Sequence, residues 1–266
     1  MVKVTSKDNA KLKEYRKLCS SRKYRVETNR FALEGVRLIC DSLKSSAVIS
    51  DLLVTEAGIE RLGERFAELE AAAKNTLLIT DELARQIGET DTPQGVFAIC
   101  EGRLTTDSLP EKAEKGILML CSLQDPGNVG TILRSAEAFG LSAVIMTADC
   151  PDAASPKVLR SSMGAALRIA IHRVADAAEA IEGLREKGIA VYAAALGEKS
   201  VSVDEVSLKN SVVMIGNEGS GLPDNLADAA DKRVILPISE NSESLNAAMA
   251  ATVFAWELSR AVRNDR

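Results

Sequence analysis

After residue 116, short apolar segments alternate with segments of helical periodicity, and this alternation limits the fold more than any other feature. The apolar segments lie at 117–122, 142–147, 168–173, 189–195, 211–216 and 232–236. The helical segments lie at 129–139, 155–165, 176–187, 223–230 and 244–263. Apolar strands joined by helices are typical of a parallel sheet, because helices cover both of its faces and bury the strands. The sequence therefore predicts an α/β domain with a parallel sheet.

A smaller α/β region precedes this domain. Its strands are expected in "RFALEG", "ISDLLVT", "TLLIT" and "GVFAIC", and its helices at 7–18, in "VRLICDSL", at 59–73 and in "DELARQIG". The polar stretch that follows carries Pro110 and is typical of a linker. A chain of 266 residues has room for about two domains of roughly 100–200 residues each. We therefore expect an N-terminal domain at 1–102, a linker at 103–116 and a C-terminal domain at 117–266.

Several classes of protein are disfavoured by what the sequence lacks. No apolar run approaches the roughly 18 residues of a membrane span, and the first residues lack the apolar core of a signal peptide. The five cysteines are scattered without a Cys-x-x-Cys pair, which argues against disulfides and zinc. The single histidine, His172, leaves no multi-histidine metal site. We expect a cytoplasmic protein with no membrane partner and no metal.

The net charge of −5 conceals an uneven distribution. Residues 1–44 contain twelve Lys and Arg against five Asp and Glu, a local charge of +7, and the remainder carries −12. A basic front on an acidic body indicates that a polyanion is bound by the N-terminal region. A solvated helix face would have the same composition, so this alternative stays open.

Three unusual loops follow three of the predicted parallel strands: "QDPGNVGTILR", "GNEGSGLP" and "PISENSESLN". Ligands of open α/β sheets bind beyond the carboxyl ends of the strands, so we expect one site here. Gly216, Gly219 and Gly221 let the backbone approach a ligand closely. Ser244 is expected to cap the last helix, with Asn246 in its first turn. The first loop matches neither of the standard nucleotide-binding patterns, G-x-G-x-x-G and G-K-[ST]. An alternative is a Rossmann-type methyltransferase that uses only this first loop, but the other two loops would then have no role.

The segments "DPGNVGTILRSAEAFG", "IGNEGSGLP" and "LPISENSESLNAAMAA" resemble, in this order, the three signature motifs of the SpoU (TrmH-like) RNA ribose 2′-O-methyltransferases, a family of the SPOUT superfamily. "SPKVLRSSMGAALRIAI" resembles the segment between the first two motifs, and "DTPQGVFAIC" resembles the end of the family's substrate-binding domain. The resemblance covers essentially 117–263. It implies a deep trefoil knot in the C-terminal domain, a small ribosomal-protein-like α/β domain before it, and S-adenosylmethionine as the cofactor.

The resemblance also implies catalytic roles for Arg134, Asn128, Glu218, Ser244 and Asn246. The family assigns the central role to the arginine. Because arginine stays protonated in water, Arg134 is either a base in an unusual environment or a clamp on the neighbouring phosphate that stabilises the alkoxide. Asn128, Ser244 and Asn246 are expected to orient the ribose and the arginine. Glu218 is expected to hold the arginine or a neighbouring donor.

The cofactor in the family is held largely by main-chain groups, which the resemblance places at Gly216, Leu236 and Leu245. A main-chain site explains why no side chain for adenine recognition stands out. Where many relatives have S-L-N-V-S-V-A, this chain has "SLNAAMA". The polar pair Ser244 and Asn246 is retained, so the departure concerns local packing.

Structured RNA is the expected substrate, and 23S-type ribosomal RNA is preferred because of the basic front. A tRNA ribose methyltransferase and a non-catalytic RNA-binding member of the same fold are the alternatives. The last is disfavoured because Arg134, Asn128 and Asn246 are all present. Aromatic residues form only 3% of the chain, so recognition should rely on backbone charge and shape more than on base stacking.

The last predicted helix carries a continuous apolar stripe. Leu245, Met249, Val253 and Trp256 follow one another at spacings of four, four and three. A helix that is apolar on more than one face must be covered on more than one side. SpoU relatives pair through this helix and the first-motif helix, so we expect a homodimer formed by the C-terminal domain.

Overall fold

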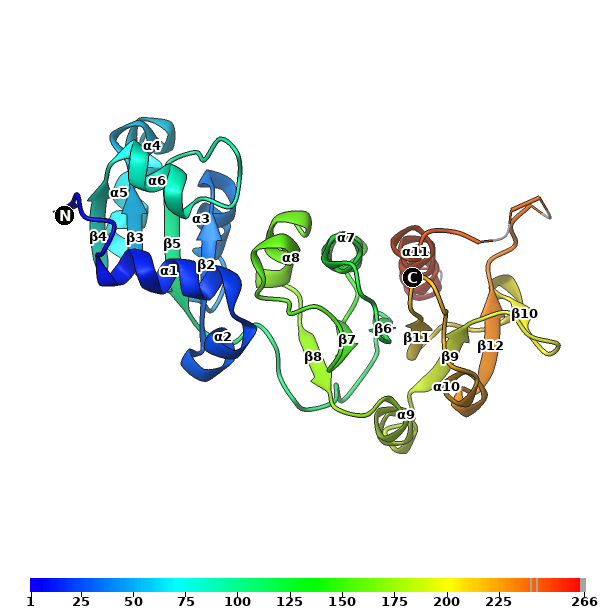
Figure 1. Ribbon diagram of the computed structural model, residues 1–266. Coiled ribbons are helices and arrows are strands. Elements are labelled where there is room, and N and C mark those ends of the chain that lie inside the picture. The colour runs from blue at the N-terminus through cyan, green and yellow to red at the C-terminus, as the bar shows by residue number, and fades with distance from the viewer. Residues whose placement is uncertain (240, 243, 264–266) are drawn as a thin grey trace. The chain divides into compact units, whose positions relative to one another are not determined.

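The computed structural model describes residues 1–239, 241–242 and 244–263 (Figure 1). These residues form two compact units. The first comprises Met1–Leu104 and Asp152–Arg168, and the second comprises Thr105–Pro151 and the residues from Ile169 on. None of the helices in the described part of the chain has both the length and the apolar composition that a bilayer span requires.

The first unit is built on a mixed five-stranded sheet. Its strands, in sheet order, are β1 Val2–Val4, β4 Asn75–Ile79, β3 Val48–Val54, β5 Val96–Glu101 and β2 Arg30–Glu34. β1, β4 and β3 run parallel, whereas β5 runs antiparallel to both β3 and β2. The four predicted strands are all present. β1 was not predicted, because three residues are too few to show a period of two.

Seven α-helices of the first unit surround this sheet in the described residues: α1 Ala10–Ser20, α2 Arg22–Thr28, α3 Val36–Ser42, α4 Glu56–Leu62, α5 Arg65–Ala72, α6 Asp81–Ile87 and α8 Pro156–Ser161. The prediction of one helix at 59–73 is wrong. The segment forms two helices because Gly63 adopts a left-handed φ of 55° and ends α4.

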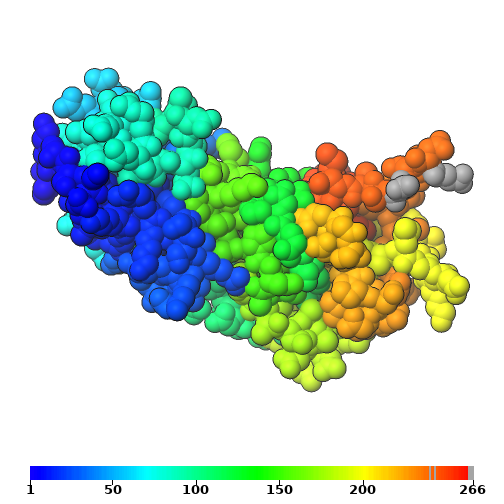
Figure 2. Space-filling model, in the orientation of Figure 1, coloured from blue at the N-terminus to red at the C-terminus, as the bar shows by residue number. Residues whose placement is uncertain are grey.

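The basic helix α1 is amphipathic in the way that its sequence predicts. Leu12, Tyr15 and Leu18 are buried against the sheet, and the Tyr15 ring packs edge-to-face on Phe97 with centroids 5.5 Å apart. Burial of each such side chain stabilises the fold by roughly 1.5–3 kcal/mol. Lys13, Arg16 and Lys17 of α1 are exposed, and the N-terminal part of the chain to which they belong is blue in Figure 2.

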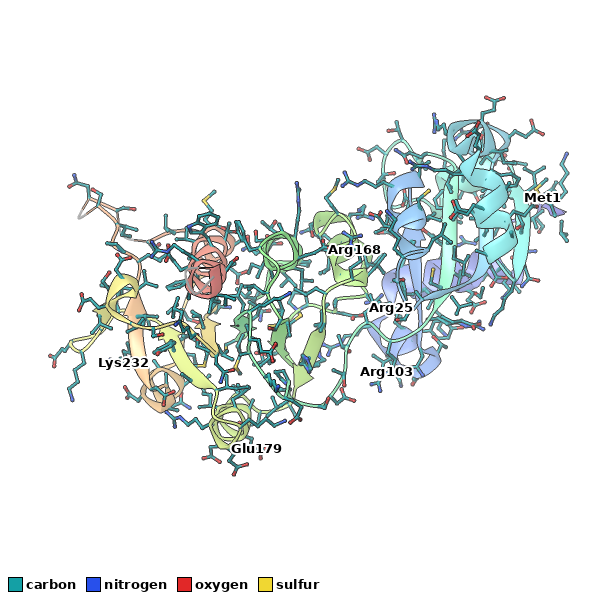
Figure 3. All side chains as sticks on the ribbon, turned by 180° about the vertical axis from the view of Figure 1, so that it is seen from behind. Met1, Arg25, Arg103, Arg168, Glu179 and Lys232 are labelled. Atoms are coloured by element: carbon teal, nitrogen blue, oxygen red, sulfur yellow. The ribbon has the colours of Figure 1, made fainter. Side chains whose placement is uncertain are left out.

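The segment Asp152–Arg168 is attached to the first unit by two ion pairs. Arg25 Nε lies 2.7 Å from Asp152 Oδ2, and Arg168 Nη1 lies 3.2 Å from Asp41 Oδ2. Both arginines are labelled in Figure 3. Helix α8 therefore packs with the first unit, although it lies in sequence among the strands of the second.

The second unit contains a seven-stranded sheet in which every pair of neighbours is parallel, as predicted. In sheet order the strands are β10 Val201–Ser202, β12 Lys232–Ile235, β9 Ala190–Ala194, β11 Ser211–Ile215, β6 Ile117–Leu120, β7 Ala143–Thr147 and β8 Ile171–Val174. The six predicted strands are present, and the two-residue β10 adds an edge. Runs such as "ILML" are fully buried on both faces.

Helices cover both faces of this sheet (Figure 1). The principal helices are α7 Pro126–Ala138, α9 Ala177–Glu186, α10 Asp224–Ala229 and α11 Ala247–Arg263. α9 and α10 pack on one face, where Ile181 and Leu184 join a core with Val191 and Met214. α7 and α11 pack on each other and on the other face. This arrangement leaves the carboxyl ends of the strands open to the loops that follow them.

Candidate active site

The second-motif loop follows β11 and is closed on itself. Asn217 and Gly221 exchange two backbone hydrogen bonds of 3.0 and 2.9 Å. A Cβ atom on Gly216 would lie 2.3 Å from the backbone of Gly221, so only glycine fits at that position. The Asn217 amide donates to the Ser122 carbonyl at 2.8 Å, which fixes the loop to the end of β6. The first two loops therefore lie side by side.

The carboxylate of Glu218 holds the start of α7. Its Oε2 accepts the Gln124 amide at 3.0 Å, and its Oε1 accepts the Asp125 amide at 3.1 Å and the Asn128 side-chain amide at 3.0 Å. Partial burial alone would raise the pKa of Glu218. The hydrogen bonds from Asn128 and the backbone outweigh burial, and the pKa lies below its usual value of 4.5. Glu218 is therefore an ionised acceptor at neutral pH.

Asn128 and Asn246 continue the hydrogen-bond chain into the third loop. Asn246 Nδ2 donates to Asn128 Oδ1 at 3.3 Å, and Asn246 Oδ1 accepts the backbone amides of Ala248 and Met249 at 2.9 and 3.3 Å. The donor and acceptor assignments along this chain are consistent. The Glu218 carboxylate at one end can only accept hydrogen bonds, and the backbone amides of α11 at the other end can only donate them. One chain of hydrogen bonds thus joins all three motif loops.

The N-cap of α11 is Asn246, and the expectation that Ser244 caps this helix is wrong. The helix begins at Ala247, so Ser244 lies too far upstream to reach its first free amides. Ser244 is exposed in the third loop. Two further residues of that predicted loop, Glu240 and Glu243, lie outside the described residues.

Arg134 lies in the middle of α7 and is exposed. None of the described residues forms a hydrogen bond or ion pair with its guanidinium, and Glu218 binds neighbouring donors instead. α7 itself is held in place by a Ser135–Thr252 hydroxyl hydrogen bond of 2.8 Å to α11. Within the described part of the chain, Arg134 is therefore a free cation on a fixed helix, beside the helix that Asn246 caps.

An apolar pocket of about 210 Å³ lies among the ends of β9 and β12, the third loop and α11. Three of the predicted residues line it: Leu236, Ser244 and Leu245. Gly216 is not among its lining residues. Ala194, Ala195 and Ala250 also line it, and their small side chains let a ligand approach the backbone. Such a pocket can take a planar, largely apolar group and bind it through main-chain groups.

Sequence reasoning missed the wall of this pocket after β9. Ala194, Ala195 and Leu196 belong to it, and Leu196 is followed by Gly197. The signal was a run of small residues at the carboxyl end of a parallel strand, which is the place where ligands bind in such sheets. The two asparagines were identified as polar groups, but their partners were not.

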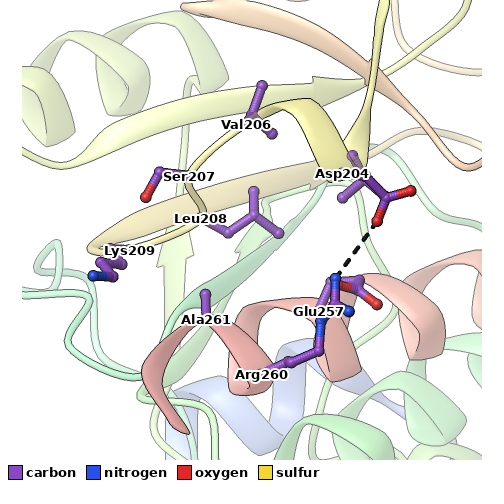
Figure 4. A pocket seen from close by; sticks show the side chains of 9 residues that line it. Asp204, Val206, Ser207, Leu208, Lys209, Glu257, Arg260 and Ala261 are labelled. Carbon is purple, nitrogen blue, oxygen red and sulfur yellow. Dashed lines mark hydrogen bonds and ion pairs between the residues drawn. The ribbon is translucent and has the colours of Figure 1, made fainter. Parts of the chain in front are cut away.

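A further pocket of about 290 Å³ lies between residues 203–209 and the end of α11 (Figure 4). Three of its charged groups are paired with each other: Arg260 Nη2 lies 3.5 Å from Asp204 Oδ1 and 2.5 Å from Glu257 Oε2. None of the described residues of the three motif loops lines it. The pocket beside the third loop is therefore the better candidate for a ligand.

Comparison with known proteins agrees with this geometry. Residues 115–256 match the model of the SpoU rRNA Methylase family, and residues 9–98 match the MRM3-like substrate binding domain. The 23S rRNA (guanosine(2553)-2′-O)-methyltransferase RlmP of Bacillus subtilis is 31% identical, over 97% of this chain and 99% of that protein. The 23S rRNA (uridine(2479)-2′-O)-methyltransferase of Streptomyces viridochromogenes is 27% identical, over 97% of this chain and 92% of that protein.

A solved structure is similar over nearly the whole length. The AdoMet-bound rRNA methyltransferase from Sinorhizobium meliloti superposes with a TM-score of 0.84 at 31% identity, and 97% of each chain is covered. The similarity therefore includes both units, each with its own fold.

Proposed function

Because the chain belongs to the SpoU rRNA methylase family, we propose that it transfers the methyl group of S-adenosylmethionine to a ribose 2′-oxygen in ribosomal RNA. The observation that carries this proposal is the hydrogen-bond chain from Glu218 through Asn128 to Asn246, which brings the three motif loops together. The relatives named above act on 23S rRNA, and 23S-type RNA is the substrate that we propose for this chain.

Arg134 is the group that we assign to the ribose and its phosphate. A 2′-hydroxyl is a weak nucleophile until negative charge on its oxygen is stabilised. The guanidinium of Arg134 is protonated and has no partner among the described residues, so it can form a planar, bidentate contact with an RNA phosphate. From there its charge stabilises the developing alkoxide. A clamp of this kind does not require the arginine to lose a proton.

Asn128 and Asn246 orient the reacting groups. Their amides are held from both ends, by the Glu218 carboxylate and by the first turn of α11. Amides fixed in this way keep their polar atoms at constant positions when a ribose enters, which lowers the entropic cost of reaction. The exposed Ser244 hydroxyl adds a further group that can bind the ribose. Glu218 acts through Asn128 and is a positioning residue.

The residues of the apolar pocket fit S-adenosylmethionine. Leu236 and Leu245 both line it, and we assign to their main chains the contacts with the adenosine. Gly216 supports the site from β11, where its missing Cβ permits the tight second loop. The cofactor supplies an electrophilic methyl group when it is bound. The pocket and the hydrogen-bond chain share the third loop, so the two ligands meet there.

A deep trefoil knot in the second unit is also proposed. β12 lies next to β9 and β10, whereas α11, which follows it, packs against α7, β6 and β11. The third loop therefore connects the β12 edge of the sheet with the region of β6 and β11, and the second-motif loop follows β11. Threading of the third loop through that region would give the knot that the family resemblance implies.

A homodimer formed by α11 and a cytoplasmic location complete the proposal. Met249, Val253 and Trp256 are exposed by 64%, 40% and 44% although they are large and apolar. An apolar surface of this kind typically marks an interface. A two-fold contact would place one copy of α11 beside the other, with the site of each copy near the boundary.

Transfer of labelled methyl groups to purified RNA tests the function. We expect 23S rRNA from cells that lack the protein to be labelled at one ribose 2′-oxygen, and transfer RNA not to be labelled. Labelling of transfer RNA alone would favour the tRNA alternative. Binding of ribosomal RNA without any transfer would indicate a non-catalytic member of the fold. Arg134→Ala is the control for contaminating activity.

A further inference from the structure

The first unit contains a cavity of about 410 Å³. Three segments form it: the end of β2 with the start of α3, the loop before β5, and α8 with the turn that follows it. All of its lining residues belong to the first unit, which holds none of the three motif loops. The cavity therefore shares no lining residue with the proposed methyl-transfer site.

One wall of the cavity is apolar. Leu38 and Leu159 are buried, with 8% and 0% exposure, and Met163 extends this wall to the surface with 36% exposure. A wall of aliphatic and thioether groups can cover the face of a planar ring. It offers nothing to a small inorganic anion.

Two arginines line the same cavity, Arg37 and Arg160. Arg37 is exposed and has no acidic partner among the described residues. The acidic residue of the wall, Glu34, already accepts hydrogen bonds from Thr90 Oγ1 at 2.5 Å and from the Glu89 amide at 2.7 Å. These three side chains carry a net charge of +1, which favours an anionic ligand.

Arg160 is the group that points most directly to a missing partner. Its Nη1 is buried and has no hydrogen-bond acceptor among the residues that the structure describes. A buried donor without an acceptor is destabilising, and more so when the group is charged. An anion that enters the cavity can supply the acceptor after a small rotation of the guanidinium. α8 holds Arg160 in place, because the ion pair of Arg25 with Asp152 and the Ser155 N-cap fix the helix start.

We propose that this cavity binds one nucleotide of the RNA substrate. Its phosphate lies on Arg160 and Arg37, and its base lies against Leu38, Leu159 and Met163. A carboxylate or a free phosphate would use the arginines but not the apolar wall, whereas a nucleotide uses both. The inference rests on the proposed function for the identity of the ligand. The substrate-binding domain model matches residues 9–98 only. The proposal adds a contact site in the first unit that also uses Arg160 of α8, which lies outside those residues.

Three variants of the full-length protein test the site. Arg160→Gln removes the charge, and Met163→Trp fills the cavity with no change of charge. Arg85→Gln, at an exposed position on α6 outside the cavity, is the charge-matched control. In filter binding with a 23S rRNA transcript, we expect Kd to rise about tenfold for each cavity variant and less than about twofold for the control. Thermal unfolding and calorimetry with S-adenosylmethionine check that both units remain folded.

Affinity equal to wild type in both folded cavity variants would overturn the proposal. Titration with adenosine 5′-monophosphate separates the two sources of a nucleotide. If Met163→Trp abolishes the binding of adenosine 5′-monophosphate but leaves the affinity for RNA unchanged, the cavity binds a free nucleotide. This result would also overturn the proposal. The two proposals can fail separately. If neither the wild type nor the variants transfer methyl groups to rRNA, the proposed function is wrong. If the cavity variants still lose affinity for RNA in that case, the cavity remains an RNA-binding site.

Discussion

Positive charge is used differently on helices α1 and α2 of the first unit and on helix α7 of the second. On α1, Lys11 Nζ lies 2.9 Å from Asp51 and Lys13 Nζ lies 2.8 Å from Asp8, and on α2 Arg25 pairs with Asp152. On α7, Arg134 has no such partner among the described residues. A free guanidinium can bind a phosphate at once, whereas a paired one must first give up its carboxylate.

The comparison shows that the number of lysines and arginines in a segment overestimates the positive charge that is available to bind RNA. The local charge of +7 in residues 1–44 is partly neutralised by carboxylates from other segments, such as Asp51 and Asp152. One unpaired arginine beside the motif loops should therefore affect function more than several lysines of the front. The predictions below test this difference.

The largest effect is expected from Arg134→Ala. Loss of one group that stabilises the transition state lowers turnover by about 10²–10³-fold. Binding of S-adenosylmethionine should be nearly unchanged, because Arg134 does not line the apolar pocket. Arg134→Lys should restore little, since an ammonium lacks the planar fork. Single-turnover methylation and calorimetry measure the two quantities, and wild-type turnover in the alanine variant would remove Arg134 from the mechanism.

Glu218→Gln should lower turnover by about tenfold through a single mismatched contact. The amide nitrogen of glutamine would replace Oε2, which now accepts from the Gln124 amide at 3.0 Å, and two donors would then face each other. Glu182→Gln, at an exposed position on α9, is the matched control. Turnover as low in the control as in Glu218→Gln would contradict a specific role.

The same pair of variants gives a pH dependence. The folded pKa of Glu218 is lower than its unfolded value, so its contribution to stability is present above about pH 4.5 and is lost as the pH falls through the folded pKa. Urea unfolding of wild type and Glu218→Gln should therefore differ at pH 6 and converge in acid. A difference that stays constant down to pH 3 would exclude the carboxylate as the cause.

These contacts also show where sequence reasoning ends. The six strands of the second unit were predicted because buried parallel strands are apolar runs, which a local pattern reveals. The Glu218–Asn128 hydrogen bond joins residues 90 positions apart, and no local pattern specifies it. The sheet order, with β12 between β10 and β9, is set by tertiary packing in the same way. The motifs identified the polar residues, and the fold determined which of them touch.

The errors have local causes. Gly63 splits the helix predicted at 59–73, because a left-handed residue ends a helix even where the apolar pattern continues. The last helix begins at Ala247 and not at residue 244, since the side chain of Asn246 accepts its first amides. Both are effects of single residues on helix ends, which periodicity does not detect.

A smaller effect is expected from the front of the chain. Lys3 and Lys7 are exposed without an acidic partner among the described residues, and Lys17 lies over the Tyr24 ring at 4.0 Å. Changing all three to Gln should weaken RNA binding and flatten its salt dependence. The log–log slope should fall by roughly 0.7 for each phosphate that the protein no longer neutralises. Filter binding at salt concentrations from about 50 to about 200 mM measures this slope.

Lys11→Met is the control for that variant. It also removes one positive charge, but it leaves the buried Asp51 carboxylate without its cation. We expect the free energy of unfolding to fall by about 2 kcal/mol, since Lys11 is partly exposed and Asp51 keeps hydrogen bonds from Ser50 and Asn75. The salt slope of RNA binding should not change. An equal decrease of slope in both variants would mean that paired and unpaired lysines contribute alike.

The last and smallest expected effect is a change of oligomeric state, which doubles the molecular mass. It follows from a comparison of helices α1 and α11. α1 buries its apolar face and exposes charge, whereas α11 buries Phe254 and Leu258 and still exposes Met249 and Trp256. Trp256 packs edge-to-face on Phe139, the C-cap residue of α7, with ring centroids 5.6 Å apart, so the end of α7 contributes to this surface as well.

A two-fold contact there should bury at least about 1,000 Å² in total. Light scattering at low micromolar concentration should give twice the chain mass of 28.4 kDa for wild type and the monomer mass for Trp256→Glu. Val26→Glu, at a 61% exposed position on α2, should remain dimeric. A dimer that survives Trp256→Glu would place the interface elsewhere. A monomeric wild type would leave the α11 stripe without a second copy to cover it.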